Sequence, residues 1–392
     1  MKKIVVMPLL RMPSGHHQVA EALINMFEKQ NKNVEIKKMD IMSYTSDVLE
    51  KIVTSMYLKW IRYTPGTYEQ VYKRFINSHS DQSGLLKLYK KLFIKKMVLL
   101  LQEENPDLII CTHGFPSFLL NQLKLKSKLD IPVINVYTDF FVNDMWGKNG
   151  IDVHLVPNQE IRWELIHEFG VPERNIHVTG IPVHEEFLFT TKDQIRSSRK
   201  RILISGGNSG LGKISSLLEE FKKSKRFDYL VLCGNNQKLF NQISSWKLSH
   251  IKPIQYLTSR SEMNLLYEQV DAIITKPGGV TISEVIQKKL PIFIHSALPG
   301  QEEVNLTFLT NRGLVFEIDH EQPIEIQLLK KIANQKQLSI CHKQMESYHK
   351  EFEVNEQGIL VLIESLLDGK TYKHNSSLIS HEYRIKQKGL SI

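Results

Sequence analysis

The chain has 392 residues, enough for two domains of ordinary size with a hydrophobic core each. Its ordinary apolar content argues against wholesale disorder, and its three scattered cysteines form no CxxC pair, so neither a disulfide framework nor a zinc site is indicated. The net charge of +9 suits an anionic partner such as a membrane face or phosphorylated substrates, and a merely basic soluble protein fits it equally well.

The N-terminus begins like a signal peptide, but its apolar run is too short and no small-residue cleavage site follows. No stretch approaches the ~20 apolar residues that cross a bilayer. We therefore expect a protein of the reducing cytoplasm, which reaches any lipid from the membrane surface.

The first half of the chain predicts alternating strands and helices. Residues 2–10 form an apolar strand, a turn over residues 12–17 follows, and residues 18–30 have helical spacing. Residues 34–39 complete a βαβ unit, whereas residues 44–104 contain no convincing strand. Further strands are predicted over residues 107–112, 132–137, 153–156 and 176–179, with a helix over residues 160–169.

A basic amphipathic helix is predicted over residues 85–102, after an aromatic and basic segment at 56–63. Its apolar face carries Leu86, Tyr89, Phe93, Met97 and Leu100, and its basic face Lys87, Lys90, Lys91 and Lys95. Such a helix can lie on an anionic membrane, or it can pack on the sheet with its lysines in water. For the segment at 56–63, contact with the membrane or the acceptor is the favoured interpretation.

A polar run over residues 190–200 is interpreted as a linker, because the same strand and helix plan restarts after it. The expected parts are a first domain over 1–189, a second domain over 201–368 and a polar tail over 369–392. In the second domain, strands are predicted over 201–205, 228–233, 251–257, 271–275, 290–295 and 313–318, and helices over 213–224, 261–269 and 280–289, with 328–364 mostly helical.

The stretch 271–305 carries the most specific chemistry. Its two predicted parallel strands, bridged by a helix, put both following loops at one sheet edge, where α/β proteins bind ligands. Gly278 and Gly279 let a backbone approach a phosphate at a helix N-terminus. Glu284 lies about one and a half turns further on, within reach of a sugar hydroxyl. The stretch therefore predicts a nucleotide-sugar site.

Four motifs in this order resemble one known family. They are Ser14-Gly15-His16, Gly206-Gly207 with Gly212, Lys276-Pro277-Gly278-Gly279 with Glu284, and Pro299-Gly300-Gln301-Glu302 with Asn305. Together, over the chain to about residue 310, they resemble monogalactosyldiacylglycerol synthases and bacterial processive diacylglycerol glucosyltransferases of glycosyltransferase family 28. A more distant likeness is to the N-acetylglucosaminyltransferase of peptidoglycan lipid synthesis. Pro13 and Ser14 stand where the family is commonly richer in glycine, which bears on acceptor specificity.

The resemblance implies an α/β fold of the GT-B type, with two Rossmann-like domains facing a central cleft. It also implies a UDP-hexose donor on the C-terminal domain, a lipid acceptor at the N-terminal domain, inversion, and no metal or other cofactor at the catalytic centre. We expect no nucleic-acid partner. The expected location is the inner face of the cell membrane, on its anionic surface.

His16 is the candidate catalytic base, since its ordinary pKa lies close to working pH. A histidine after a first strand is more often structural, and the resemblance at this position is what implies the role of base. His113 and Asp139 end neighbouring strands and either assist His16 or cap turns. The donor side is expected to use glycine turns and Lys276 for phosphates, Glu284 for the ribose, and Gln301 and Glu302 for the hexose. The alternatives are a solvated turn lysine, an exposed first-turn acid and helix caps. The expected donor-binding residues are Gly206, Gly207, Gly210, Gly212, Lys276, Gly278, Gly279, Glu284, Gln301, Glu302 and Asn305.

The predicted function is a hexosyltransferase that moves a hexose from a UDP-sugar to diacylglycerol or a glycosyldiacylglycerol. Two alternatives stay open: the same transfer to a polyprenyl-linked or soluble acceptor, and a regulator that binds nucleotide sugar without catalysis. A Rossmann dehydrogenase fits less well, because the first turn is not GxGxxG.

Overall fold

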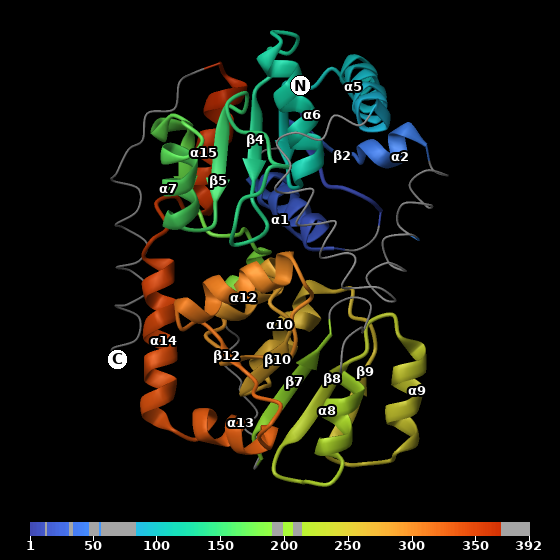
Figure 1. The fold of residues 1–392 in the computed structure, drawn as a ribbon, viewed down its shortest axis with the longest axis vertical. Coiled ribbons are helices and arrows are strands. Elements are labelled where there is room, and N and C mark those ends of the chain that lie inside the picture. The colour runs from blue at the N-terminus through green and yellow to red at the C-terminus, as the bar shows by residue number, and fades with distance from the viewer. Residues whose placement is uncertain are drawn as a thin grey trace. The chain divides into compact units, whose positions relative to one another are not determined.

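The computed structural model describes residues 1–11, 14–30, 34–46, 55, 84–189, 199–206 and 214–369, without the side chains of residues 30, 84–90 and 214–216. The predictions for residues 56–63, for most of the linker, for Gly207, Gly210 and Gly212, and for the tail beyond residue 369 therefore lie outside the described residues. The chain divides into two compact units (Figure 1).

The first unit contains a six-stranded, wholly parallel sheet in the order β2-β1-β3-β4-β5-β6. Its strands are β1 (Lys2–Met7), β2 (Val34–Lys38), β3 (Leu108–Cys111), β4 (Val133–Val136), β5 (Val153–Val156) and β6 (Ile176–Val178). Every residue of β3 to β6 is buried, as expected for apolar strands of a parallel sheet covered by helices. All the strands predicted for this half are confirmed.

The helices of the first unit are α1 (Gly15–Gln30), α2 (Ile41–Thr45), α5 (Gly84–Glu104), α6 (Gly114–Leu125), α7 (Gln159–His167) and α15 (Glu356–Leu367), with a short 3₁₀ helix η1 (Glu173–Asn175). The sequence patterns did not predict α2 or α6. Both begin with a capping side chain: Asp40 accepts from the first-turn N–H groups of α2, and His113 accepts from the Phe115 N–H of α6.

The second half of α5 packs into the core of the first unit. Phe93, Met97 and Leu100 are completely buried, while Lys91 and Lys95 are exposed. This confirms that the helix packs on the sheet, for the part whose side chains are described, and it leaves Lys91 and Lys95 on the outer face. Leu86, Tyr89, Lys87 and Lys90 fall outside that part.

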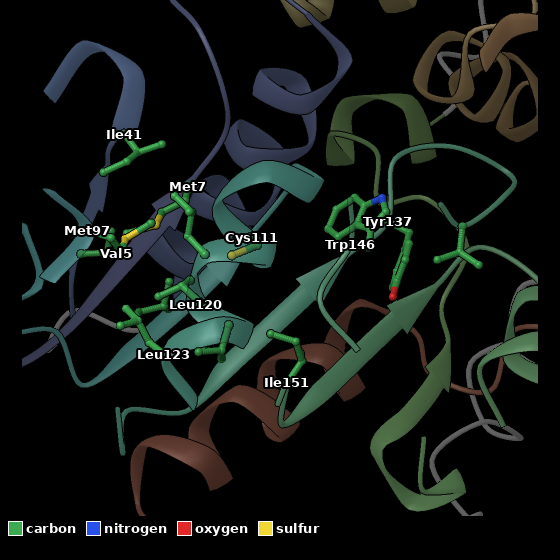
Figure 2. Close-up of a cluster of buried hydrophobic side chains, with 14 of the residues drawn as sticks. Val5, Met7, Ile41, Met97, Cys111, Leu120, Leu123, Tyr137, Trp146 and Ile151 are labelled. Atoms are coloured by element: carbon green, nitrogen blue, oxygen red, sulfur yellow. The ribbon is translucent and has the colours of Figure 1, made fainter. Parts of the chain in front are cut away.

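The core of this unit joins strands and helices in one apolar cluster (Figure 2). Val5 and Met7 from β1 meet Met97 from α5 and Leu120 from α6, and each is fully or almost fully buried. Burying a side chain of this size contributes about 1.5–3 kcal/mol to folding. This packing fixes the carboxyl ends of β1 and β3, where the candidate base lies.

The second unit contains another six-stranded parallel sheet, in the order β12-β11-β10-β7-β8-β9. Its strands are β7 (Arg201–Ser205), β8 (Asp228–Leu232), β9 (Ile251–Ile254), β10 (Ala272–Thr275), β11 (Ile292–Ile294) and β12 (Phe316–Glu317). Its helices are η2 (Glu185–Leu188), α8 (Ile214–Phe221), α9 (Gln237–Ser245), α10 (Arg260–Glu268), α11 (Gly279–Gln287), α12 (Gln301–Asn311), α13 (Ile324–Ile332) and α14 (Gln335–His349). The strands predicted for this half are confirmed, mostly with shorter bounds.

The two units divide the chain differently from the expected domain boundaries. The first unit ends at Pro182 rather than at residue 189, and it takes the chain back from His349 onward. The Glu353 and Val354 N–H groups both donate to the Val178 carbonyl, at 2.7 and 3.3 Å. The segment 349–368, expected in the second domain, therefore completes the first unit, because its hydrogen bonds lead to β6.

Candidate functional site

Each sheet has one point at which the strand order reverses. In the first unit β2 and β3 lie on opposite sides of β1, and in the second unit β8 and β10 lie on opposite sides of β7. In open parallel sheets, ligands bind outside the carboxyl ends of the strands at such a point. The candidate base follows β1, and the glycine turns follow β7 and β10, so the topology of each unit agrees with the sequence motifs.

His16 lies in the first turn of α1 and is held by the ends of two other strands. Its Nδ1 is 3.0 Å from the carbonyl of Thr112, after β3, and 2.8 Å from the hydroxyl of Thr138, after β4. A carbonyl only accepts, so Nδ1 donates its hydrogen to Thr112. In the neutral ring the lone pair is therefore on Nε2.

The protonation state of His16 follows from its surroundings. Burial lowers the pKa of His16, against the opposing effects of the Asp139 carboxylate and the Thr112 hydrogen bond. The ring is then neutral at neutral pH, and Nε2 can accept a proton. When it does, the negative charge of Asp139 stabilises the imidazolium that forms. These are the properties that a general base requires.

His113 supports this arrangement and is not itself suited to act as a base. Its Nδ1 accepts a hydrogen bond of 3.0 Å from Phe115 N–H, which caps α6, so the capping interpretation is confirmed for His113. Burial lowers the pKa of His113 well below its usual range. Its ring also packs edge-on against His16, with 4.5 Å between the centroids, and so helps to orient it.

The N-terminus of α11 in the second unit presents backbone N–H donors. Gly278 caps the helix, and among the described residues no side chain accepts from its first N–H groups. The backbone at Gly278 is ordinary, with φ −79°, and a Cβ there would meet no atom within 4 Å. Neither strain nor packing requires this glycine, and a glycine here leaves room for the predicted approach of an anion to the helix N-terminus. Gly279 begins the helix, and Gly206, directly after β7, is buried.

Lys276 is not the solvated turn residue that the sequence left open. Its side chain is only 13% exposed, and its Nζ lies 4.0 Å from Oε1 of Glu302. It follows β10 directly, two residues before the helix cap. A mostly buried ammonium group therefore stands close in the chain to the N–H donors of α11, and both favour a negative charge.

Glu284 is buried on α11, which excludes an exposed first-turn acid. Its Oε2 accepts a hydrogen bond of 2.9 Å from the hydroxyl of Tyr267 on α10. Burial raises the pKa of Glu284 to about 7, opposed by the charge of Arg260 and by this hydrogen bond. The hydrogen bond from Tyr267 engages Oε2, and Oε1 is the second oxygen that this carboxylate can offer a ligand.

The turn from β11 to α12 is fastened by acidic side chains of α12. Glu302 Oε2 accepts from the Leu298 N–H at 2.6 Å, and Glu303 Oε2 accepts from the Gly300 N–H at 3.2 Å. Glu302 therefore holds the loop, as the capping alternative proposed. Gln301 is half-buried and Asn305 is buried one turn further on. Contact of these three residues with a hexose stays a prediction.

Three residues that the sequence patterns did not single out contribute to these edges. Thr138 lies two residues beyond the buried strand β4, and this position near a strand end was a usable signal. Tyr267 gave no sequence signal, because its contact with Glu284 joins two helices and residues 17 positions apart. His295 was taken as the last residue of an apolar strand. It is buried just beyond β11, beside Lys276.

Two further properties concern the described residues only. They contain no group of three or more histidine, cysteine, aspartate or glutamate side chains placed to hold a metal ion. None of their helices combines the length and the apolar character that a membrane span requires.

Comparison with known sequences identifies the family. The model for monogalactosyldiacylglycerol (MGDG) synthase matches residues 16–183. The chain is 44% identical over 319 residues to the uncharacterized glycosyltransferase YkoN of Bacillus subtilis (strain 168), covering 81% of this chain and 84% of that one. The chain belongs to the monogalactosyldiacylglycerol synthase and diacylglycerol glucosyltransferase family. It is also 29% identical over 327 residues to the processive diacylglycerol beta-glucosyltransferase of Bacillus cereus (strain B4264), covering 79% and 81%.

Solved structures agree on the fold of this glycosyltransferase. A UDP co-structure of MnaA from S. aureus matches with a TM-score of 0.59 at 16% identity, covering 95% of this chain and 99% of that one. MurG of Acinetobacter baumannii matches with a TM-score of 0.57 at 15% identity, covering 93% and 99%. The expected α/β class with two Rossmann-like domains of the GT-B type is confirmed.

Proposed function

We propose that this glycosyltransferase moves a hexose from a UDP-sugar to diacylglycerol or a glycosyldiacylglycerol, with inversion at the anomeric carbon. The edge beyond β10 in the second unit carries the proposal. It combines the N-terminal N–H groups of α11, the ammonium of Lys276 and the buried carboxylate of Glu284. The first two suit a diphosphate and the third suits the two hydroxyls of a ribose. Relatives named as diacylglycerol glucosyltransferases support the lipid acceptor.

The proposed chemistry is a single displacement. His16 Nε2 takes the proton of the acceptor hydroxyl, whose oxygen forms a bond to the anomeric carbon of the hexose. The bond from that carbon to the phosphate oxygen breaks, and UDP leaves with the electron pair. The N–H groups of α11 and Lys276 stabilise the charge on the leaving diphosphate. Attack from the face opposite the leaving group inverts the configuration.

A transfer assay tests this function. Purified protein is incubated with vesicles that contain diacylglycerol, and with UDP-glucose or UDP-galactose labelled in the sugar. We expect a labelled glycolipid whose anomeric configuration, measured by NMR, is opposite to that of the donor. Binding of UDP-hexose without any lipid product would favour the alternative readings: a polyprenyl-linked or soluble acceptor, or a regulator without catalysis.

Neighbouring histidines provide a matched test of the base. Replacing His16 by Gln removes the proton acceptor, and we expect kcat to fall by about 10²–10⁴-fold. His17 is the control, because its Nε2 hydrogen-bonds the Leu10 carbonyl and does not contact Thr112 or Thr138. His17→Gln should retain most of the activity. Near-normal turnover by His16→Gln would end the assignment of the base.

The outer face of α5 is the proposed contact with an anionic membrane at its cytoplasmic side. The face predicted to be apolar lies in the core, but Leu92 and Leu99 are 44% and 37% exposed, next to Lys91 and Lys95. Exposed leucines beside lysines suit a surface of anionic lipids. Replacing Lys91 and Lys95 by Glu should abolish sedimentation with vesicles rich in phosphatidylglycerol, while leaving UDP binding intact. Unchanged sedimentation would remove α5 from the membrane contact.

A further inference from the structure

His295 lies at the ligand-binding edge of the second sheet and is not used in the proposed chemistry. It follows β11, and its N–H donates to the Thr275 carbonyl at 3.2 Å, so the β10–β11 register places it opposite Lys276. The residue is only 2% exposed. It is the first residue of the loop that leads to Gln301.

The two ring nitrogens of His295 have different surroundings. Nδ1 lies 2.9 Å from the hydroxyl of Ser296, which belongs to the same loop and is half-buried. Nε2 is buried and has no hydrogen-bond partner among the described residues. Burial, together with the charges of Lys276 and His320, lowers the pKa of His295 to about 4, so the ring is neutral at neutral pH. A buried polar atom without a partner costs free energy and requires an explanation.

The chemistry of the neutral ring limits what can pair with Nε2. The Ser296 hydroxyl can donate to Nδ1 or accept from it, so Nε2 carries either a hydrogen or a lone pair. A phosphate oxygen only accepts, so it can pair with Nε2 only when Nε2 carries the hydrogen. A sugar hydroxyl both donates and accepts, so it can pair with Nε2 in either state.

We propose that His295 Nε2 hydrogen-bonds a hydroxyl of the donor hexose and thereby helps to select the sugar that is transferred. The inference rests on the proposed UDP-hexose donor and names a residue that reads its sugar. Lys276, opposite His295, is assigned to the diphosphate to which that sugar is attached. The loop that begins at His295 leads to Gln301, for which a hexose contact is also predicted.

His250 is a matched control within the same unit. It is buried to the same degree, its Nε2 lies 3.2 Å from the Phe221 carbonyl, and its Nδ1 has no partner among the described residues. It precedes β9, however, at the amino ends of the strands, which is the edge opposite to the ligand site. If an unpartnered histidine nitrogen is merely tolerated by this fold, the two residues should respond alike to substitution.

The experiment measures the affinities of UDP, UDP-glucose and UDP-galactose by calorimetry for the full chain and its variants. For His295→Phe we expect the affinity for the preferred UDP-hexose to fall about tenfold, the effect of one lost hydrogen bond. UDP affinity should stay within about twofold, and the preference between the epimers should narrow. His295→Gln, whose amide donates and accepts, should keep most of that preference. His250→Phe should leave all three affinities unchanged.

Nitrogen-15 NMR of labelled histidines gives a second measurement that needs no substitution. The Nε2 signal of His295 should move when UDP-hexose is added and stay in place with UDP alone. Equal losses for UDP and UDP-hexose in His295→Phe, or no loss for either, would overturn the role in sugar selection. A wild-type chain that binds neither UDP nor UDP-hexose would refute the proposed donor itself, a result visible before any variant is made.

Discussion

Gly278 and Gly313 are glycines of the second unit that serve different purposes. Gly278 has an ordinary φ and open space around it, whereas Gly313 has φ +64°, in the left-handed region. Gly278→Ala should therefore leave stability unchanged or raise it by about 0.5 kcal/mol, because alanine lowers the conformational entropy of the unfolded chain. It should weaken UDP-hexose binding if the proposed diphosphate meets the α11 N–H groups, because the added methyl group would obstruct that approach.

Gly313→Ala is the contrast, and it should lose roughly 1–2 kcal/mol of stability to backbone strain. Its UDP-hexose affinity should not change. Chemical denaturation and calorimetry on both variants separate the two effects. Unchanged affinity in Gly278→Ala would place the phosphates elsewhere.

Glu284 should make both stability and nucleotide binding depend on pH. Its pKa of about 7 in the folded protein lies above the ~4.3 of an unfolded glutamate. Between these values the folded state holds a proton that the unfolded state has lost, so stability falls as pH rises from about 4.3 to about 7. Glu284→Gln, which is always neutral, should be more stable than the wild type at pH 8, by up to about 4 kcal/mol, and lose this advantage near pH 4.

Nucleotide binding should show the opposite trend in the wild type. The ionised carboxylate is the better acceptor for ribose hydroxyls, so UDP affinity should rise as pH increases through 7, and Glu284→Gln should lose this dependence. Tyr267→Phe removes the hydrogen bond that lowers the pKa of Glu284. The pH at which UDP affinity rises should therefore be higher in this variant than in the wild type. Calorimetric titrations between pH 6 and 8 measure it. A UDP affinity in the wild type that does not change with pH would contradict the contact of Glu284 with the ribose.

At the scale of elements, two glutamates at the turn from β11 to α12 allow a helix-capping role to be compared with a ligand contact. The side chain of Glu303 is exposed and accepts from the Gly300 N–H, so Glu303→Ala should cost about 1 kcal/mol of stability and leave UDP-hexose affinity intact. Glu302 holds the Leu298 N–H and stands near Lys276, so Glu302→Ala should reduce both stability and affinity. Thermal melts and calorimetry on the pair check this. Equal UDP-hexose affinities in the two variants would show that Glu302 caps the helix and does not contribute to ligand binding.

Elements whose signal is local were predictable from the sequence. The β10 run, the glycine turn and the apolar spacing of α11 lie within 16 consecutive residues (272–287), and each was located to within a residue or two. The sequence also placed His16 at the turn after β1. It gave no account of which groups hold His16, because Thr112 and Thr138 are brought to it from other strands. The short helix α2 escaped detection because it offers too few residues for a period.

At the scale of the whole molecule, the return of the chain to the first unit was not predictable from sequence order. The apolar residues of α15 give a helical pattern that fits either core. What decides between them is a set of contacts far apart in sequence: Glu353 accepts from the Val178 N–H and forms an ion pair with Arg162. These contacts join segments about 175 and 191 residues apart, which no local pattern records.

Gly180 and Phe352 test how much this return contributes to the first unit. Gly180 has φ +73°, and a Cβ there would stand 2.4 Å from Cζ of the Phe352 ring, too close for both to remain in place. Gly170 is the matched control, since it has a similar φ of +66° in the same unit and a Cβ there would meet no atom within 4 Å.

Both alanine variants should lose roughly 1–2 kcal/mol to backbone strain. Gly180→Ala should lose more, because it also displaces Phe352 and the segment that leads to α15. We expect a lower unfolding midpoint for Gly180→Ala than for Gly170→Ala, together with faster proteolytic release of the chain beyond His349. Equal stability losses and equal cleavage rates would show that the contact with Phe352 is dispensable. The first unit would then depend on the Glu353 hydrogen bonds to keep α15 in place.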